Sequence, residues 1–335
     1  MTKITLRDVA REAGVGTATV ERVVNGRGGV RPDTVEKVFL AVRKLNYRHV
    51  MPEAHRGLVR IEVVLVRPET NFYSRMNQAF ERIAALLDHS IVVHRTFARE
   101  NDPADFAHYI AKPKNRRSSL IVVAPDHPDV VTSVRQAAAL GIPVIQIMTR
   151  PAPELPYVGI DNYAAGRTAA YYMSRMQAGK AGSFVALCHS GGAYENHRER
   201  IRGFSEYLAE HADGGHAFVE VMFDFDDEHN TIELLRNALR RHPNVIGVYS
   251  AGGDNVAVAS VLKNQRTRMA FWVGHELSDQ TRSYLREGIM SVVLDQVPEI
   301  QARRSIDLTL KALGLIDVDV STEPVRFLTV TPENV

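Results

Sequence analysis

Short runs of apolar and β-branched residues alternate with amphipathic helical stretches from residue 60 onward. The first series of runs is RIEVVLVR, SIVVHRTF, SLIVVAP, IPVIQIM and PYVGID, and the second is SFVALCH, HAFVEVMF, NVIGVYS, MAFWVGH and SVVLD. Such alternation is typical of parallel strands joined by crossover helices. We expect helices from about Ser74, Pro103, Pro128 and Asn162, and then near His197, Glu228, Asn255, Asp279 and Val297. Two similar series predict an α/β fold with two Rossmann-like lobes.

The chain ends with one further apolar run, VRFLTV, after a predicted helix from Ile300 to Leu313. This run is too short to form a domain, so we expect it to join a lobe that is already built. Ligands of open α/β sheets bind beyond the carboxyl ends of the strands. Binding residues should therefore lie at the junctions between strands and helices.

Residues 4 to 47 have a different pattern, which predicts three short helices. Thr5 and Asp8 have the spacing of a capping box at the start of the first helix. The second helix is expected from Thr17 to Val24, and Pro32 suits the first position of the third. Two short helices across a turn that contains Gly form a helix-turn-helix, so this segment predicts an all-α head.

The second helix of such a motif enters the major groove of DNA, with its N-terminal residues over the base edges. Thr17 and Ala18 would reach the bases first, and Arg22 could bond guanine O6 and N7 together. Residues 1–60 hold twelve Lys or Arg against six Asp or Glu, whereas the rest of the chain has a net charge of −4. A basic head on an acidic body favours phosphate contact. The alternative is a generic helical surface on which Arg22 is only solvated.

The segments TLRDVAREAGV, TVERVVNG, VEKV and LNY resemble the DNA-binding head of the LacI/GalR family of bacterial repressors. The body is similar to that family's two lobes, which have the architecture of periplasmic sugar-binding proteins. The resemblance implies that Thr17, Ala18 and Arg22 read bases and that Asn25 lies near phosphate.

Two positions depart from the family's pattern in the predicted recognition helix. Gly16 and Glu21 stand where the family usually has Ser. Gly16 caps the helix without a side chain. A carboxylate that faces DNA repels phosphate unless it accepts from a cytosine amino group, so Glu21 affects both operator sequence and affinity.

The predicted domains are a head at residues 1–48, a hinge linker at 49–59 and a ligand-binding and dimerisation body at 60–335. In the family, the linker forms a short helix on the operator and inserts a Leu, three residues after an Ala, into the minor groove. Here Ala54 and Leu58 are four residues apart. We predict that Leu58 is the inserted residue. The alternative is that Leu58 begins the core of the body.

Polar and aromatic residues follow the strands of the first series. Asn71, Phe72 and Tyr73 resemble the segment with which ribose-binding-like proteins bond a sugar and stack on its ring. Alternatively, Asn71 only caps the next helix. Asp126 ends the third strand, where the same proteins hold a carboxylate that accepts from sugar hydroxyls, although it too could be only a cap.

The second series offers further candidates by the same resemblance. Arg200, four residues before Phe204, matches an Arg that contacts the ligand, whereas the alternative is an arginine on a solvated helix face. Asp254 and Gln296 occupy junctions where sugar binders place an Asp and a Gln, and Asp254 could instead be only a helix cap. Together these two residues favour the ribose-like branch.

The remaining polar residues at strand-to-helix junctions do not predict a metal site or a catalytic site. His275 and Glu276 stand where repressors more often have Gly, an aromatic residue and Asp, and the sequence does not say which of them faces the cleft. His189, Glu195 and His197 lack the spacing of a metal site. We therefore expect no metal, no cofactor and no catalytic residue.

The predicted function is a sequence-specific transcription regulator, most simply a repressor, controlled by a monosaccharide, polyol or related carbohydrate between the lobes. We expect it to be a homodimer on a pseudo-palindromic double-stranded operator. No run of about 18 apolar residues predicts a membrane span, so we expect a cytoplasmic protein. The alternative is an enzyme of doubly wound fold that holds a phosphorylated metabolite in its Gly-rich turns. The chain has no GxGxxG motif or P-loop to support that alternative.

Overall fold

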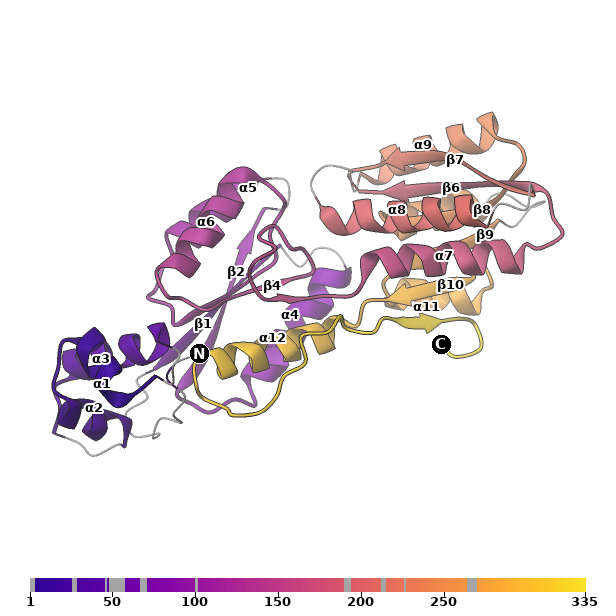
Figure 1. The fold of residues 1–335 in the computed structure, drawn as a ribbon. Coiled ribbons are helices and arrows are strands. Elements are labelled where there is room, and N and C mark those ends of the chain that lie inside the picture. The colour runs from indigo at the N-terminus through magenta and orange to yellow at the C-terminus, as the bar shows by residue number, and fades with distance from the viewer. Residues whose placement is uncertain are drawn as a thin grey trace.

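A small helical head is followed by a two-lobed body in the computed structural model (Figure 1). The model describes residues 4–25, 29–45, 47, 58–66, 71–99, 102–189, 194–211, 215–225, 227–263 and 270–335. The head contains α1 (Leu6–Ala13), α2 (Thr17–Val24) and α3 (Pro32–Lys44). Apolar residues at helical spacing close its core, namely Val9, Ala10, Ala13, Val20, Val23, Val24, Val38, Ala41 and Val42. The predicted helix-turn-helix with a third helix is confirmed.

Local signals set the ends of the first two helices. The Asp8 carboxylate accepts from the backbone N–H and the hydroxyl of Thr5 at 2.9 and 2.6 Å, which fixes the start of α1. Gly14 ends α1 at φ 65°, a conformation that costs glycine little. Gly16 is the N-cap of α2 and gives it no side-chain cap.

The first lobe is a parallel sheet with the strand order β2-β1-β3-β4-β5. Its strands are β1 (Val59–Val66), β2 (Ile91–Ala98), β3 (Ser119–Val122), β4 (Val144–Ile147) and β5 (Tyr157–Val158). Its helices are α4 (Asn71–Ala84), α5 (Pro103–Ala111), α6 (Pro128–Ala139) and α12 (Pro298–Ala312). Strand β1, which lies between β2 and β3, is buried except at Arg60, as its nearly continuous apolar run predicts.

The second lobe is a sheet with the order β11-β10-β9-β8-β6-β7. Its strands are β6 (Gly182–Cys188), β7 (His216–Phe223), β8 (Val245–Gly252), β9 (Phe271–His275), β10 (Val292–Asp295) and β11 (Leu328–Val330). Its helices are α7 (Asn162–Met176), α8 (Glu195–Glu210), α9 (Glu228–Arg241), α10 (Asn255–Lys263) and α11 (Asp279–Arg286). The predicted pair of Rossmann-like lobes is confirmed.

The chain passes between the lobes after β5, after β10 and after α12 (Figure 1). The last passage places Val325 beside Ile160, and the Val325 N–H donates to the Gly159 carbonyl oxygen at 2.8 Å. Strand β11 then pairs antiparallel with β10. The final run therefore joins a lobe already built, as predicted, and the body is held together by neighbouring chain passages.

Two features concern membrane insertion and the reactivity of the cysteine thiol. Within the described ranges, no helix has both the length and the apolar character needed to cross a membrane. Cys188 ends β6 in a buried position, and burial raises the pKa of its thiol to about 12. A thiol in this environment is a poor nucleophile because it remains protonated.

Candidate functional site

A cavity of about 420 Å³ lies between the two lobes, and both lobes contribute to its wall. The first lobe contributes Phe72, Tyr73 and Met148. The second lobe contributes residues that follow the carboxyl ends of its strands, namely His189 after β6, Gly253 and Asp254 after β8, Glu276 after β9 and Gln296 after β10. The position agrees with the expected location of binding residues at strand-to-helix junctions.

Aromatic side chains form the first lobe's wall of the cavity. Helix α4 begins at Asn71, three residues earlier than the expected Ser74, so Phe72 and Tyr73 lie in its first turn. Their rings are buried and meet edge to face, with centroids 5.4 Å apart. Flat apolar surfaces of this kind can pack against the C–H face of a small ring.

Close packing of α7 and α8 positions the most deeply buried cation of the cavity, Arg200. A Cβ atom on Gly203 would lie 2.1 Å from the carbonyl oxygen of Tyr163, so the helices approach at a separation that only glycine allows. The Arg200 side chain is 2% exposed. Its Nε donates to Asn162 Oδ1 at 2.9 Å, and its Nη1 donates to the Ala251 carbonyl oxygen at 2.7 Å.

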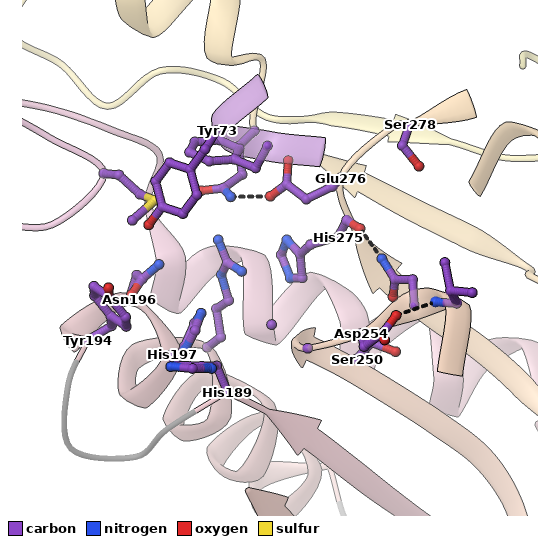
Figure 2. Close-up of a pocket in the computed structure, with 18 of the residues that line it drawn as sticks. Tyr73, His189, Tyr194, Asn196, His197, Ser250, Asp254, His275, Glu276 and Ser278 are labelled. Atoms are coloured by element: carbon purple, nitrogen blue, oxygen red, sulfur yellow. Dashed lines mark hydrogen bonds between the residues drawn. The ribbon is translucent and has the colours of Figure 1, made fainter. Parts of the chain in front are cut away.

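Two further residues of α8 share the cavity face with Arg200. Asn196 and His197 precede Arg200 by four and three residues, so the three side chains lie on one side of the helix. Figure 2 shows Asn196, His197, Tyr194 and His189 together on one side of the cavity, and Glu276, His275 and Asp254 on the other. One side of the wall therefore carries an amide and two imidazoles, and the other carries two carboxylates and one imidazole.

The junction after β9 brings both His275 and Glu276 to the cavity. The Nε2 atom of His275 lies 2.9 Å from the Tyr249 hydroxyl, and burial lowers the pKa of the imidazole well below its ordinary value. Glu276 has a φ of 73°, a rare backbone conformation for this residue type. Burial, together with the charge of Asp295, raises the pKa of the Glu276 carboxyl to about 7. A neutral imidazole and a partly protonated carboxyl can each donate or accept a hydrogen bond.

The junctions after β8 and β10 complete this side. Asp254 Oδ1 accepts from the backbone N–H groups of Val256 and Ala257 at 2.8 and 3.2 Å, so Asp254 both caps α10 and lines the cavity. Gln296 donates from Nε2 to Glu276 Oε1. This contact fixes one oxygen of Glu276 and leaves the other for a different partner.

Several buried polar atoms of the cavity residues have no hydrogen-bond partner within the described part of the chain. They include the acceptors Asn196 Oδ1, Asn255 Oδ1 and Glu276 Oε2 and the donor Arg200 Nη2. A buried polar atom without a partner is costly, and a bound ligand can remove that cost. The acceptors suit hydroxyl groups, and the cationic donor suits an oxygen acceptor.

An ionic cluster joins the lobes beside the cavity. Arg75 of α4 binds Asp295 with Nη1 and Nη2 at 2.6 and 3.1 Å, and binds Glu299 with Nε at 3.0 Å. Arg75 Nη1 also donates to the Leu277 carbonyl oxygen at 3.2 Å, and the Leu277 N–H donates to Asp295 Oδ1 at 3.0 Å. The cluster connects the first turns of α4 and α12 to the ends of β9 and β10.

The predicted ligand-binding residues are only partly brought together. Phe72, Tyr73, Arg200, Asp254 and Gln296 line the cavity, and their contacts with a ligand stay predictions. Asp126 is not among the lining residues, because its carboxylate binds Arg198 of α8 at 2.8 Å across the lobes. The side chain of Asn71 lies outside the described part of the chain. The ligand roles of Asn71 and Asp126 also stay predictions.

Sequence reasoning missed some residues of the wall, including His189, Tyr194, Asn196, His197 and Ser250. His189 carried a detectable signal, because it directly follows a predicted strand. Asn196 and His197 could have been found from their spacing to Arg200. Among the described residues, no group of three or more His, Cys, Asp or Glu side chains could hold a metal ion.

The second candidate site is the outward face of α2 in the head. The four predicted DNA-contacting residues of this segment are exposed, namely Thr17, Ala18, Arg22 and Asn25. Their contacts with DNA stay predictions. Leu58 is 47% exposed and directly precedes β1, so it is not part of the body's core. Residues 49–57 of the predicted linker lie outside the described residues, and the predicted domain boundaries stay predictions.

Comparisons with known proteins give two family matches. Residues 5–49 match the family described as bacterial regulatory proteins, lacI family. Residues 61–314 match the family described as periplasmic binding protein domain. The two matches together extend over most of the chain.

Individual relatives include regulators of several bacteria. Catabolite control protein A of Staphylococcus xylosus is 37% identical over 30% of this chain, and the chain spans only 31% of that protein's length. The ribose operon repressor of Halalkalibacterium halodurans is 22% identical over 85% of this chain and 80% of its own. The regulator DegA of Bacillus subtilis is 26% identical over 62% of this chain and 61% of its own.

The body is similar to solved sugar-binding structures. A solute-binding protein from Burkholderia graminis in complex with D-arabinose has a TM-score of 0.72, at 21% identity, over 83% of this chain and 97% of its own. A glucose-galactose binding protein from Geobacillus stearothermophilus has a TM-score of 0.71, at 20% identity, over 83% of this chain and 99% of its own. At this identity the likeness establishes the fold alone. The named proteins are regulators and binding proteins, in agreement with the expectation of a protein that is not an enzyme.

Proposed function

Because this chain belongs to the lacI family of bacterial regulatory proteins, with a periplasmic binding protein domain as its body, we propose that it is a DNA-binding transcriptional repressor controlled by a monosaccharide or polyol. The relatives include a ribose operon repressor. The effector binds in the cavity between the lobes, and the operator is read by the face of α2 that carries Thr17, Ala18 and Arg22. Such a regulator acts in the cytoplasm, where its operator lies.

The set of buried acceptors without partners is the observation that carries the ligand assignment. Asn196, Asn255 and Glu276 each leave one oxygen without a hydrogen bond within the described residues. A polyhydroxylated molecule supplies several O–H donors at close spacing, and Phe72 and Tyr73 supply an apolar surface for its ring. The volume of about 420 Å³ suits a single sugar unit.

Regulation follows from the position of the ligand between two lobes. A ligand that contacts α4 of one lobe and α8 of the other favours the arrangement in which both sets of contacts form. The ion pair between Asp126 and Arg198 and the Arg75 cluster already join the lobes, so their geometry responds to the same movement. The effect on DNA affinity equals the difference in ligand affinity between the two arrangements.

We further propose that two copies bind a pseudo-palindromic operator. One head exposes few base-reading side chains, and a dimer doubles the readout on half-sites one helical turn apart. The basic balance of the head supports affinity through phosphate contacts, which weaken steeply as salt rises.

The test is selection of DNA from a random library with the purified full chain, followed by anisotropy measurements with and without sugars and polyols. A parallel thermal-shift screen finds the effector, because a bound ligand raises the melting temperature. We expect a palindromic consensus and a change of affinity with the compound that stabilises the protein. Enrichment of no sequence, or an operator affinity that no stabilising compound alters, would contradict the proposal.

A further inference from the structure

Arg200 is a buried cation whose hydrogen-bond partners are all neutral. Its two contacts are the side-chain oxygen of Asn162 and the backbone carbonyl oxygen of Ala251. No ion pair to Arg200 occurs between described residues, and Nη2 has no hydrogen-bond partner among them. Burial lowers the pKa of the guanidinium, but arginine remains charged in proteins. A buried charge without a counter-ion is unfavourable.

The carboxylates that line the cavity have other partners. Asp254 accepts from two backbone N–H groups at the start of α10. Glu276 accepts from Gln296, and its raised pKa of about 7 reduces its negative charge near neutrality. Neither group forms an ion pair with Arg200, so the charge of Glu276 acts on this cation only from a distance.

The surroundings of Arg200 also contrast with the opposite wall. Asn196 and His197 share its face of α8, and His189 lies beside them, whereas Asp254 and Glu276 lie across the cavity (Figure 2). The side that carries Arg200 can therefore hold a negative group beside the hydroxyl acceptor Asn196, while the other side accepts from further hydroxyls. A ligand with one acidic end and several hydroxyls would use both sides.

We propose that the effector is a sugar acid, a monosaccharide derivative whose carboxylate binds Arg200. This inference rests on the proposed function and narrows the chemical class of its ligand. Arg200 has a single free nitrogen, because Asn162 and Ala251 occupy Nε and Nη1. One free donor on one cation suits a carboxylate with a single charge better than a phosphate, which needs more donors for its three oxygens.

The experiment compares matched sugars that differ only in oxidation at one carbon. Binding of D-glucose and D-glucuronate, of D-galactose and D-galacturonate, and of D-glucose 6-phosphate is measured by calorimetry on the full chain near neutral pH. We expect at least one uronate to bind about tenfold or more tightly than its neutral partner, as a charge-assisted hydrogen bond predicts. Arg200→Gln should remove this preference.

Two further variants make the comparison specific. Arg202→Gln removes an exposed arginine from the same helix, and we expect it to keep the preference for the acid. Arg200→Lys keeps the charge, and we expect it to keep part of the preference. Circular dichroism shows whether each variant folds, and the comparison of ligands on the unaltered protein needs no variant.

The outcomes separate this inference from the proposed function. If a neutral sugar binds as tightly as its matched acid, or if the phosphate binds more tightly than both uronates, the sugar-acid assignment is wrong while carbohydrate control stands. If none of these compounds binds, the sugar-acid assignment is again wrong. The wider thermal-shift screen then decides whether the proposed function fails with it. A preference that survives in Arg200→Gln would also overturn the assignment.

Discussion

Gly166 of α7 lies so close to Arg200 of α8 that a Cβ atom built on it would be 2.0 Å from the Arg200 carbonyl oxygen. The obstacle is backbone, which cannot turn away as a side chain can. The two helices meet at this point and at Gly203, and their contact holds Arg200 against Asn162 at the start of α7. The small residue therefore determines where the buried cation of the cavity lies.

We expect Gly166→Ala to push α7 and α8 apart. Overpacking of this kind costs roughly 1–3 kcal/mol of the free energy of unfolding. Ligand affinity should also fall, because Arg200 moves with its helix. Thermal unfolding and calorimetry measure both effects, with Ser174→Ala on α7 as the control. An unchanged melting temperature would show that the helices can separate at no cost.

The raised pKa of Glu276 predicts a dependence of stability on pH. The carboxyl has an ordinary pKa of 4.5 and a folded-state pKa of about 7, so its proton binds the folded state more tightly. Its contribution to the free energy of unfolding is fully present below about pH 4.5 and is lost as the pH rises through about 7, on the order of 3 kcal/mol. Denaturant unfolding from pH 5 to 8 measures this loss.

The comparison for this prediction is Glu276→Gln, which keeps the shape and removes the titrating group. We expect its stability to vary less over the same pH range than that of the unaltered protein. Glu228→Gln, at an exposed position of α9, is the control and should keep the original pH profile. Identical profiles in the unaltered protein and Glu276→Gln would contradict the assignment of the dependence to Glu276.

The Arg75 cluster predicts a link between stability and ligand response. Arg75→Ala leaves the buried Asp295 carboxylate without its cation, which costs roughly 3 kcal/mol or less because Arg75 is partly exposed. We expect a lower melting temperature and a smaller effect of the ligand on operator affinity. Arg82→Ala, on the exposed side of α4, is the control. An equal loss in both variants would show that the cluster has no special role.

We predict that Arg22 reads one base pair in each half-site of the operator. Arg22→Ala should relax preference at one base pair in each half-site, at a cost of about 1–3 kcal/mol, because a bidentate contact to guanine is lost. Anisotropy titrations against a set of single-base operator variants measure this. Arg11→Ala, an exposed arginine of α1, should leave the pattern of preferences unchanged. A uniform loss of affinity on all sequences in Arg22→Ala would indicate a phosphate contact.

A substitution at Leu58 tests whether this side chain inserts into the minor groove of the operator. Leu58→Ala should weaken operator binding by roughly 1–3 kcal/mol and reduce DNA bending. The melting temperature should barely change, because the side chain is 47% exposed. Leu86→Ala, an exposed leucine of the body, is the matched control. Undiminished bending with Leu58→Ala would show that the linker contacts the operator in another way.

Much of the fold could be predicted because its signals are local. The start of α1 depends on Thr5 and Asp8, which are three residues apart, and α5 and α6 begin at the expected prolines. The predicted strand runs become β1 to β11 in order, because each apolar run must be buried on a sheet. The displaced boundary of α4 moved Phe72 and Tyr73 from a loop into a helix.

The binding residues were predictable only as far as the strand junctions. Asp254 and Gln296 were selected by their place after strands and Arg200 by its spacing to Phe204, and each lines the cavity. Asp126 also follows a strand, yet it binds Arg198 of the other lobe. Position along the chain cannot distinguish these cases, because both kinds of residue lie at the same edge of a sheet.

The sequence by itself determined the helical head, the two parallel lobes and the edge of each sheet at which polar residues gather, because capping, periodicity and strand burial act within a few residues. Only the tertiary structure decided that Gly166 allows Arg200 to be buried against Asn162, and that His275 and Glu276 both face the cavity. Those relationships join segments far apart in the chain. They depend on how closely helices and lobes pack, which is a property of side-chain volumes across an interface and not of any local pattern.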